Sequence, residues 1–257
     1  MVRLAVTGAA GRMGTRIVEL ASADERFSVA VALEAPGHAR IGDCIVKGVK
    51  IVDRLEADFD VLIDFSAPDA TMMYLDMVEK SGKRAVIGTT GHTAEQQAKI
   101  AQAAKRIPVV KAANMSVGVN VLLQLVARAA QVLGPDYDIE ILEGHHRFKK
   151  DAPSGTALAL LDSICKAIGR NPAETVVHGR EGRDALRRAG QIGMHALRLG
   201  DTVGEHEVFF GTLGETISLK HSAHTRDTFV NGALRAAAWL ADKPAGLYSM
   251  QDVLFGK

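Results

Sequence analysis

Residues 2–14 read VRLAVTGAAGRMG, a short apolar run followed by a glycine-rich turn. After this turn, apolar residues recur at helical spacing from Arg16 to Ala21, which predicts a strand, a tight turn and then a helix. Glycines occupy every third position of the turn, at Gly8, Gly11 and Gly14. A pyrophosphate that binds at a helix N-terminus must approach backbone N–H groups closely, and a Cβ atom would hold it off. The stretch therefore predicts a dinucleotide-binding turn.

An acidic residue stands where a dinucleotide-binding unit needs one. The β-rich run from Ser28 to Leu33 ends at Glu34, 20 residues beyond Gly14. Its carboxylate can accept hydrogen bonds from the ribose hydroxyls of adenosine. The glycine spacing, G-x-x-G-x-x-G, is a weak signal by itself, because such a turn can serve packing alone and Glu34 can be a surface residue. The strand before the turn and the helix after it favour the coenzyme.

The residues that follow Glu34 bear on the choice between NADH and NADPH. Ala35 comes next, so no arginine stands directly after the acid to hold a 2′-phosphate. His38 and Arg40 lie close by in the sequence and could take that role. The pattern leans towards NADH.

Three further apolar runs in the first half are separated by helical patterns, at Val61–Ile63, Ala85–Ile87 and Pro108–Val110. Thr93 and Gln96 fit a capping box in front of one of these helices. Continuous apolar strands alternating with helices are typical of a parallel sheet covered on both faces. The residues after the last two runs should meet at the carboxyl edge of the sheet, where small side chains and hydroxyls admit ribose and nicotinamide, unless they are plain turn residues.

The pattern changes near residue 117. A long helix over Val121–Leu133 and an alternating run over Tyr137–Leu142 come first. After a helix over 156–168, strands are expected in succession at 193–198, 205–210 and 216–221, with an exposed loop over 171–190 and a last helix over 228–240. Successive strands without intervening helices indicate a mixed or antiparallel sheet. The fold class is therefore α/β, with a Rossmann-like parallel-sheet domain and a smaller α+β domain.

The composition is that of an ordinary globular chain. Of 257 residues, 47 % are apolar and 24 % charged, and the formal net charge is +1, which gives no electrostatic reason to expect nucleic acid or a membrane surface as a partner. The two cysteines, Cys44 and Cys165, do not form a disulfide framework, which favours the cytoplasm. Glycines near the start argue against a signal peptide, and Val121–Leu133 is too short to span a bilayer.

Residues 143–156 read EGHHRFKKDAPSGT and carry the chemistry of the second half. Ser154 is a natural N-cap, so the first N–H groups of the following helix form an anion site suited to a carboxylate. Lys149 adds positive charge, and a histidine titrates near neutral pH. An acid catalyst beside a carboxylate site suits the reduction of an unsaturated acid, in which hydride goes to one atom and a proton to another.

Other interpretations compete for this stretch. The paired histidines can be structural, and the basic run can be a solvated turn. No metal-ligand spacing accompanies them, so no metal is expected, and Ser154 lacks the G-x-S-x-G setting of a nucleophile. Two other functions remain: an oxidoreductase acting on an aldehyde or sugar, and a coenzyme-sensing regulator without turnover. The residues alone leave these alternatives open.

Taken together, the motifs resemble the 4-hydroxy-tetrahydrodipicolinate (dihydrodipicolinate) reductase family of the diaminopimelate and lysine pathway. The glycine turn and the run E-x-H-H-x-x-K-x-D-x-P-S-G-T carry most of the likeness. It extends through Asp64–Pro68, Gly88–Thr90, Ala112–Asn120, Gly204–His206 and Phe229–Ala233, and thus over almost the whole chain. The resemblance implies reduction of 4-hydroxy-2,3,4,5-tetrahydrodipicolinate to 2,3,4,5-tetrahydrodipicolinate with NADH or NADPH.

The resemblance also implies roles for individual residues. His145 matches the general acid/base and Lys149 the proton donor, while His146, Gly155 and Thr156 match groups that bind the substrate carboxylates. The coenzyme-binding positions are Gly8, Ala9, Ala10, Gly11, Arg12, Met13, Glu34, Gly88, Thr89, Thr90, Ala112, Ala113, Asn114 and Met115. Arg226 matches a position that approaches the substrate when the domains close. Departures from the family pattern fall at Phe148, Lys150 and Ala35, and only the last bears on a role, the coenzyme preference.

The family organisation predicts a dinucleotide-binding domain over 1–116, to which 226–257 returns, and a substrate-binding and oligomerisation domain over 117–225. It also implies a homotetramer assembled through the sheet of the second domain. Val208 and Phe210 share one face of an expected strand. That face either joins subunits or belongs to the core of one chain.

Overall fold

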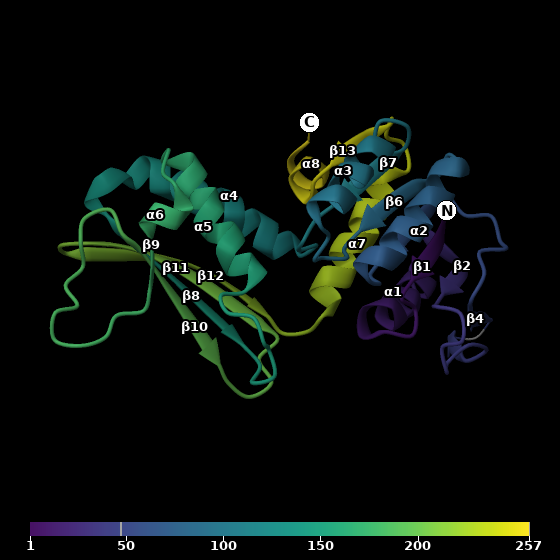
Figure 1. The fold of residues 1–257 in the computed structure, drawn as a ribbon, viewed down its shortest axis with the longest axis horizontal. Helices are drawn as coiled ribbons and strands as arrows, with labels where there is room; N and C mark the ends of the chain where they lie inside the picture. Colours follow the sequence, from purple (N-terminus) through teal and green to yellow (C-terminus); the bar gives the residue numbers. More distant parts are fainter. Residues whose placement is uncertain (47, 257) are drawn as a thin grey trace. The chain divides into compact units, whose positions relative to one another are not determined.

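The computed structural model describes residues 1–46 and 48–256, and Figure 1 shows their fold. The chain forms two compact units. Unit 1 comprises Met1–Val117 together with Asp227–Lys257, and unit 2 comprises Gly118–Arg226. Each unit is built on one β-sheet.

The sheet of unit 1 has eight strands in the order β13-β7-β6-β5-β1-β2-β4-β3. All neighbouring pairs are parallel except β3 and β4, which are antiparallel. The strands are β1 Val2–Thr7, β2 Phe27–Leu33, β3 Cys44–Val46, β4 Val49–Val52, β5 Val61–Asp64, β6 Arg84–Ile87, β7 Pro108–Lys111 and β13 Gly246–Tyr248. The predicted parallel sheet is confirmed, although the short strands β3, β4 and β13 were not expected.

Helices cover both faces of this sheet, namely α1 Arg12–Ser22, α2 Pro68–Lys80, α3 Ala94–Ala103, α7 Asp227–Leu240 and α8 Met250–Phe255. Leu4 and Val6 of β1 join the core cluster formed with α1, α7 and α8, whereas Ala5 joins the cluster formed with α2 and α3. Burial on both faces explains why the strands are continuous apolar runs. The expected capping box is present, with Thr93 as the N-cap of α3 and Gln96 bonding back to it.

The sheet of unit 2 has five strands in the order β12-β11-β8-β10-β9. The central strand β8 is parallel to β10 and antiparallel to β11, so the predicted mixed sheet is confirmed. Its strands are β8 Asp138–His145, β9 Val176–His178, β10 Ile192–Arg198, β11 Gly204–Thr212 and β12 Glu215–Ala223. The helical elements are α4 Val117–Leu133, the 3-10 turn η1 Gly134–Asp136, α5 Gly155–Ala167 and α6 Pro172–Thr175.

Two expectations about unit 2 are settled by its packing. Residues 171–190 are not wholly a loop, because Asn171 caps the short helix α6 and Val176–His178 pairs with β10. Val208 and Phe210 are fully buried in the core of unit 2, so that strand face packs within the chain. The loop prediction is thus wrong in its first part, and the intrachain interpretation of Val208 and Phe210 is correct.

The apolar helix is longer than the sequence suggested. Val117–Asp136 is long and apolar enough to cross a membrane by length and composition alone. Leu122, Val126 and Ala130 are buried in the core cluster of unit 2, while Gln124 and Arg128 are exposed. We therefore assign this segment to the core of unit 2.

Candidate active site

The glycine-rich turn joins β1 to α1, and two of its glycines have a clear steric reason. Gly8 has a φ of +67°, and a Cβ there would stand 2.5 Å from the carbonyl oxygen of Phe65. A Cβ at Gly14 would stand 2.1 Å from the carbonyl oxygen of Gly8. Gly11 is the N-cap of α1 and provides no capping side chain. The turn thus packs tightly and presents the uncapped helix N-terminus that an anionic pyrophosphate requires.

Glu34 lies against this turn. Its Oε2 accepts a hydrogen bond from the N–H of Ala10 at 3.0 Å, and its Oε1 accepts one from the N–H of Ala35 at 3.0 Å. Arg40 reaches the same turn, because its Nη1 donates to the carbonyl oxygen of Ala10 at 3.0 Å. The predicted acid and the nearby arginine therefore both contact the glycine-rich turn, within unit 1.

The remaining residues of the turn differ in exposure. Ala9 is fully buried, and its carbonyl oxygen accepts a hydrogen bond from Thr15 Oγ1 at 2.8 Å. Arg12 and Met13 begin α1, where Arg12 is exposed and Met13 is half-buried. Of these three, Arg12 has the side chain most available to a ligand.

A cavity of about 770 Å³ lies at the carboxyl ends of β6, β7 and β13. It is lined by four of the residues expected to hold the coenzyme, Thr89, Thr90, Ala112 and Ala113. Lys111 and His92, which the sequence did not single out, line it too. Burial lowers the pKa of Lys111, and burial together with the charge of Lys111 lowers the pKa of His92. The cavity thus combines small residues and hydroxyl groups with two basic side chains, those of Lys111 and His92.

The other three expected coenzyme residues of this edge have structural contacts. A Cβ at Gly88 would stand 2.3 Å from the ring of Phe65. Asn114 Oδ1 accepts a hydrogen bond from the N–H of Ser116 at 2.8 Å, which shapes the turn after β7. The side chain of Met115 is 2 % exposed and belongs to the core, so only its main chain is available to a ligand.

Asp64 organises the carboxyl edge of the sheet and was not predicted as a functional residue. It is 1 % exposed and sits at the end of β5. Four hydroxyl groups donate to its carboxylate at 2.5–2.8 Å, those of Thr7, Ser66, Thr71 and Thr89. Asp64 therefore fixes Thr89, a predicted coenzyme residue, to the ends of β1 and β5.

In unit 2, His145 ends β8 and is held by a buried carboxylate. Its Nδ1 lies 2.6 Å from Oε2 of Glu143, which is fully buried and also paired with Arg198. Burial lowers the pKa of His145, and the charges of Lys149 and Arg198 act in the same direction against the opposing effect of Glu143. The net effect lowers the pKa of His145 below its ordinary value, which favours the neutral ring that can accept a proton.

The N-terminus of α5 lies close to this histidine along the chain. Ser154 is its N-cap, with Oγ accepting a hydrogen bond from the N–H of Ala157 at 3.2 Å. Gly155 and Thr156 open the helix, as predicted. His206 of β11 contacts Ser154 Oγ through Nε2 at 3.1 Å, and burial lowers the pKa of His206 to about 4. A neutral histidine thus supports the cap of the anion-binding helix end.

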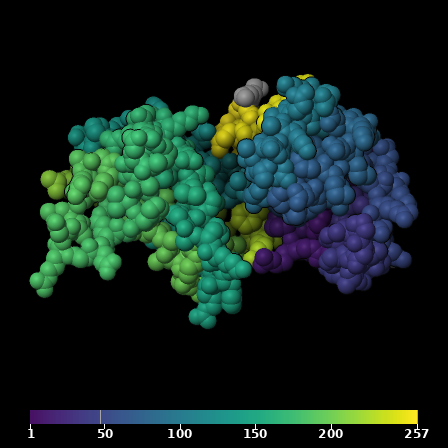
Figure 2. All heavy atoms as spheres, viewed as in Figure 1, coloured from purple at the N-terminus to yellow at the C-terminus, as the bar shows by residue number. Residues whose placement is uncertain are grey.

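Lys149 belongs to the loop between β8 and α5, which stands out from unit 2 as the teal projection in Figure 2. Its Nζ donates to Asp151 Oδ1 at 2.9 Å. His146 lies at the start of this loop, and its buried Nδ1 has no hydrogen-bond partner within residues 1–46 and 48–256. Phe148 is 77 % exposed. The loop thus holds one lysine paired with an acid and one imidazole whose buried Nδ1 is unpaired among the described residues.

Each predicted set of site residues comes together within its own unit. The coenzyme set lies along the carboxyl edge of the sheet of unit 1, and the set of His145, His146, Lys149, Gly155 and Thr156 lies between β8 and α5. Sequence reasoning missed Asp64, Arg198 and His206 as members of these sites. Asp64 and His206 were quoted only as parts of matching motifs, and Arg198 carries no local signal beyond ending a strand.

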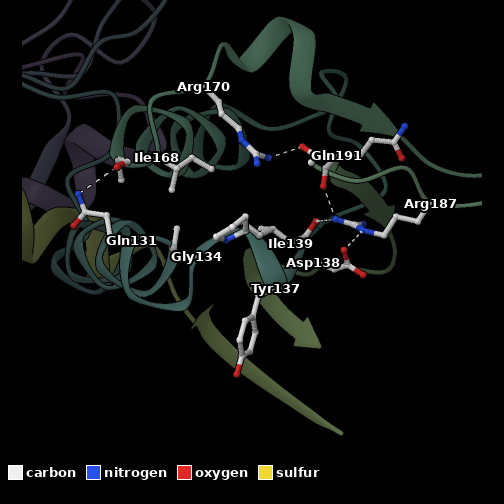
Figure 3. A pocket seen from close by; sticks show the side chains of 13 residues that line it. Gln131, Gly134, Tyr137, Asp138, Ile139, Ile168, Arg170, Arg187 and Gln191 are labelled. Atoms are coloured by element: carbon white, nitrogen blue, oxygen red, sulfur yellow. Dashed lines mark hydrogen bonds and ion pairs between the residues drawn. The ribbon is translucent and has the colours of Figure 1, made fainter. Parts of the chain in front are cut away.

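A second cavity, of about 280 Å³, lies in unit 2 at the end of β8 opposite to His145. Figure 3 shows Ile168, Gly134 and Gln131 on one side and Arg170, Gln191 and Arg187 on the other. Arg170 donates to the carbonyl oxygen of Gly190, and Arg187 pairs with Asp138. None of the predicted site residues lines this cavity. It is therefore separate from the His145 site.

Comparison with known proteins identifies the family. The family model described as dihydrodipicolinate reductase, N-terminus, matches residues 2–115, and the model for the C-terminus matches residues 118–254. A 4-hydroxy-tetrahydrodipicolinate reductase of Hahella chejuensis is 48 % identical over 99 % of both chains. A protein of the same name from Anaeromyxobacter sp. is 49 % identical over 99 % of this chain and 98 % of its own.

Solved structures confirm the fold. The chain superposes on a dipicolinate-bound dihydrodipicolinate reductase from Paenisporosarcina sp. TG-14 with a TM-score of 0.79 at 23 % identity, over 98 % of each chain. A myo-inositol dehydrogenase from Corynebacterium glutamicum shares the fold with a TM-score of 0.62 at 13 % identity, over 100 % of this chain and 93 % of its own. The family models and the two relatives of nearly equal length confirm the resemblance that the motifs indicated. The chain belongs to the dihydrodipicolinate reductase family.

Proposed function

We propose that His145 and Lys149 carry the proton transfer of this enzyme and that the N-terminus of α5 binds a carboxylate of its substrate. The reaction is the NAD(P)H-dependent reduction of 4-hydroxy-2,3,4,5-tetrahydrodipicolinate to 2,3,4,5-tetrahydrodipicolinate, a step of lysine and diaminopimelate biosynthesis. One observation supports these roles above all: the Glu143 carboxylate contacts both His145 Nδ1 and the N–H of Ser154. The proton-transfer group and the anion-binding helix end are thus held by one side chain.

We assign the coenzyme to unit 1 and the substrate to unit 2. The domain boundaries expected from the sequence, 116/117 and 225/226, each lie one residue before the boundaries of the two units, 117/118 and 226/227. The glycine turn fits a pyrophosphate, because the N-cap Gly11 has no side chain to cap the N–H groups of α1. Glu34, already on the turn, is placed to accept from ribose hydroxyls. Small residues and hydroxyls at Thr89, Thr90, Ala112 and Ala113 provide room for the nicotinamide end. When bound, the coenzyme supplies the hydride.

The substrate is a dicarboxylate, and unit 2 offers two kinds of partner for it. The first-turn N–H groups at Gly155 and Thr156 carry the partial positive charge of the helix N-terminus, which suits one carboxylate. The imidazole of His146 is assigned to the other. As hydride reaches the conjugated cyclic imine, the hydroxyl leaves as water after receiving a proton. Lys149 delivers that proton, or His145 does so once its Nε2 has taken up a proton.

The cellular compartment is proposed on the thiols. Cys44 is exposed, Cys165 is buried, and both are free. Unpaired cysteines suit a reducing environment, and we place the enzyme in the cytoplasm.

We expect His145→Gln and Lys149→Ala each to lower kcat by about 10²- to 10⁴-fold, the usual scale for loss of a general acid. Lys150→Ala is the matched control, since it removes a neighbouring cation of the same loop that has no assigned role. Steady-state kinetics on the three purified variants check this. Full turnover by His145→Gln would refute its role.

Gly155→Ala tests the carboxylate site. A Cβ at Gly155 meets no protein atom within 4 Å, and alanine favours a helix, so the melting temperature should stay the same or rise. The added methyl group projects into the space assigned to the carboxylate, and KM for the substrate should rise by about tenfold, the equivalent of about 1.4 kcal/mol. Lys166→Ala, at the other end of α5, should leave KM unchanged. An unaltered KM in Gly155→Ala would move the carboxylate elsewhere.

For the coenzyme we expect kcat/KM to be higher with NADH than with NADPH. The Glu34 carboxylate repels a 2′-phosphate, and Ala35 offers no cation beside it. Arg40 is the nearby cation, so Arg40→Ala should lower kcat/KM for NADPH more than for NADH. Oxidation of each coenzyme is followed in an assay coupled to the preceding synthase, with pyruvate and aspartate semialdehyde as inputs. A clear NADPH preference would contradict the assignment, and no oxidation of either coenzyme would contradict the function.

We propose a homotetramer assembled through the face of the unit 2 sheet that α4 and α5 leave uncovered. Leu142 and Phe209 are half-buried on that face, and Leu197 is 47 % exposed. Burial of these side chains between subunits would be favourable. Light scattering on the purified protein should give four times the chain mass of 27.4 kDa, and Leu197→Arg should reduce it. A monomeric wild-type protein would contradict the proposal.

A further inference from the structure

Glu143 has charged and polar partners from three parts of unit 2, namely β8, the start of α5 and β10. Its side chain is fully buried near the end of β8. Oε1 accepts from the N–H of Ser154 at 3.1 Å and from Nη2 of Arg198 at 2.9 Å. Oε2 lies 2.6 Å from His145 Nδ1 and accepts from Nη1 of Arg198 at 2.9 Å. One carboxylate therefore contacts a β-strand histidine, a helix N-cap and a guanidinium from β10.

These contacts fix where the proton of His145 resides. Burial raises the pKa of Glu143, but the hydrogen bonds from Arg198 and His145 outweigh it, so the pKa stays below its ordinary value and the group is ionised. An ionised carboxylate can only accept, so His145 Nδ1 must carry a hydrogen. In neutral His145, Nε2 is then the proton acceptor.

The free nitrogen of His145 is kept accessible by its neighbour on β11. A Cβ at Gly204 would stand 3.3 Å from His145 Nε2, closer than most contacts of that kind. His145 Nε2 has no hydrogen bond to any part of the chain that the structure describes. Glu143 thus orients one edge of the ring inward, and the absence of a side chain at Gly204 leaves the other edge open.

We propose that Glu143 is a positioning residue for the reduction: by holding both His145 Nδ1 and the N–H of Ser154, it sets the separation between the proton-transfer nitrogen and the carboxylate-binding end of α5. The proposal rests on the function assigned above. It predicts that Glu143 acts through His145 and α5, without touching substrate.

Several charged or titratable groups surround the ring of His145. Loss of Glu143 should therefore change the titration of this ring, whereas loss of an ion pair with a structural role alone should not. Groups from four segments face the ring: Glu143 from β8, Lys149 from the loop, Arg198 from β10 and His206 from β11, whose ring centroid lies 5.2 Å from that of His145. The carboxylate of Asp151 pairs with Lys149 instead. Glu143 is thus the anion that directly opposes the cations around His145. Its removal must change the titration of His145 as well as the stability of the fold.

Glu143→Gln is the decisive variant. Glutamine has one acceptor oxygen where glutamate has two. Its side chain therefore cannot accept a hydrogen bond from His145 Nδ1 with one oxygen and from the Ser154 N–H and Arg198 with the other. We expect kcat to fall by about 10- to 100-fold, the scale seen when an orienting partner of a functional histidine is lost. The pKa of His145, read from the pH dependence of kcat/KM and from NMR of its ring nitrogens, should move down. His145→Asn assigns the NMR signals.

The chain contains a matched control on the other face of the same strand. Glu140 of β8 is also a carboxylate bonded to a histidine, His195 Nε2 at 2.6 Å, and to Arg180 at 2.9 Å. Glu140→Gln removes an equivalent charged cluster away from the proposed site. Compared at equal oligomeric state, it should keep kcat within about twofold while Glu143→Gln loses activity.

Two further measurements cover the case in which Glu143→Gln does not fold. In the wild-type protein at pH 7, the NMR signals of His145 should show a hydrogen on Nδ1 and none on Nε2. Glu143→Asp keeps the charge with a shorter reach, so the pKa of His145 should return towards the wild-type value while kcat stays low.

The proposal is overturned if wild-type His145 carries its hydrogen on Nε2, or if Glu143→Gln leaves both the ring titration and kcat unchanged. An equal loss in Glu140→Gln would also overturn it, because the effect would then be one of stability. The NMR measurements require no turnover. If the wild-type protein oxidises neither coenzyme, the function fails, while the NMR measurements still decide whether Glu143 holds the hydrogen of His145 on Nδ1.

Discussion

The carboxylate of Glu143 and the guanidinium of Arg198 form a bidentate ion pair inside unit 2. A fully buried carboxylate is costly unless every lone pair has a partner, and loss of one partner of such a pair typically costs about 3–5 kcal/mol. Here the remaining partners are His145 and the N–H of Ser154, so the electrostatic requirement of one side chain positions two others. Arg198 extends the arrangement, since Nη2 also donates to the carbonyl oxygen of Asp151 at 2.6 Å. The positions of His145 and Ser154 in unit 2 therefore depend on this ion pair.

The two anion sites proposed above share one local architecture. A strand ends, a turn follows, and a helix begins, at β1–α1 in unit 1 and at β8–α5 in unit 2. The turn of unit 1 is built from glycines, because a pyrophosphate has to approach the backbone. The turn of unit 2 is longer and cationic, and Ser154 caps its helix. In the proposed function each helix N-terminus binds an anion, and the difference between the two turns matches the difference between a diphosphate and a carboxylate.

Local patterns in the sequence were sufficient for the strands and helices that carry the site. Continuous apolar runs such as Val61–Ile63 predicted strands buried on both faces, and Thr93 with Gln96 predicted a helix start. The contacts that complete the sites could not be predicted in this way. Arg198 lies 55 residues from Glu143, and His206 lies 52 residues from Ser154, so these pairs form only when the strands of the sheet align. Strand β4, Val49–Val52, is as long as β5, but Lys50 interrupts its apolar run, so it gave no continuous apolar signal.

The order of the two units along the chain has a consequence for synthesis on the ribosome. Unit 2 is continuous, whereas unit 1 is completed by α7 and α8, which contribute Val230, Leu234 and Val253 to a core begun by β1. During translation, unit 2 can fold as soon as its last residue emerges, while the sheet of unit 1 still lacks the helices α7 and α8 that complete the cover of one apolar face. A nascent chain released before α7 would therefore carry a folded substrate unit and an incomplete coenzyme unit, a form exposed to proteases and chaperones.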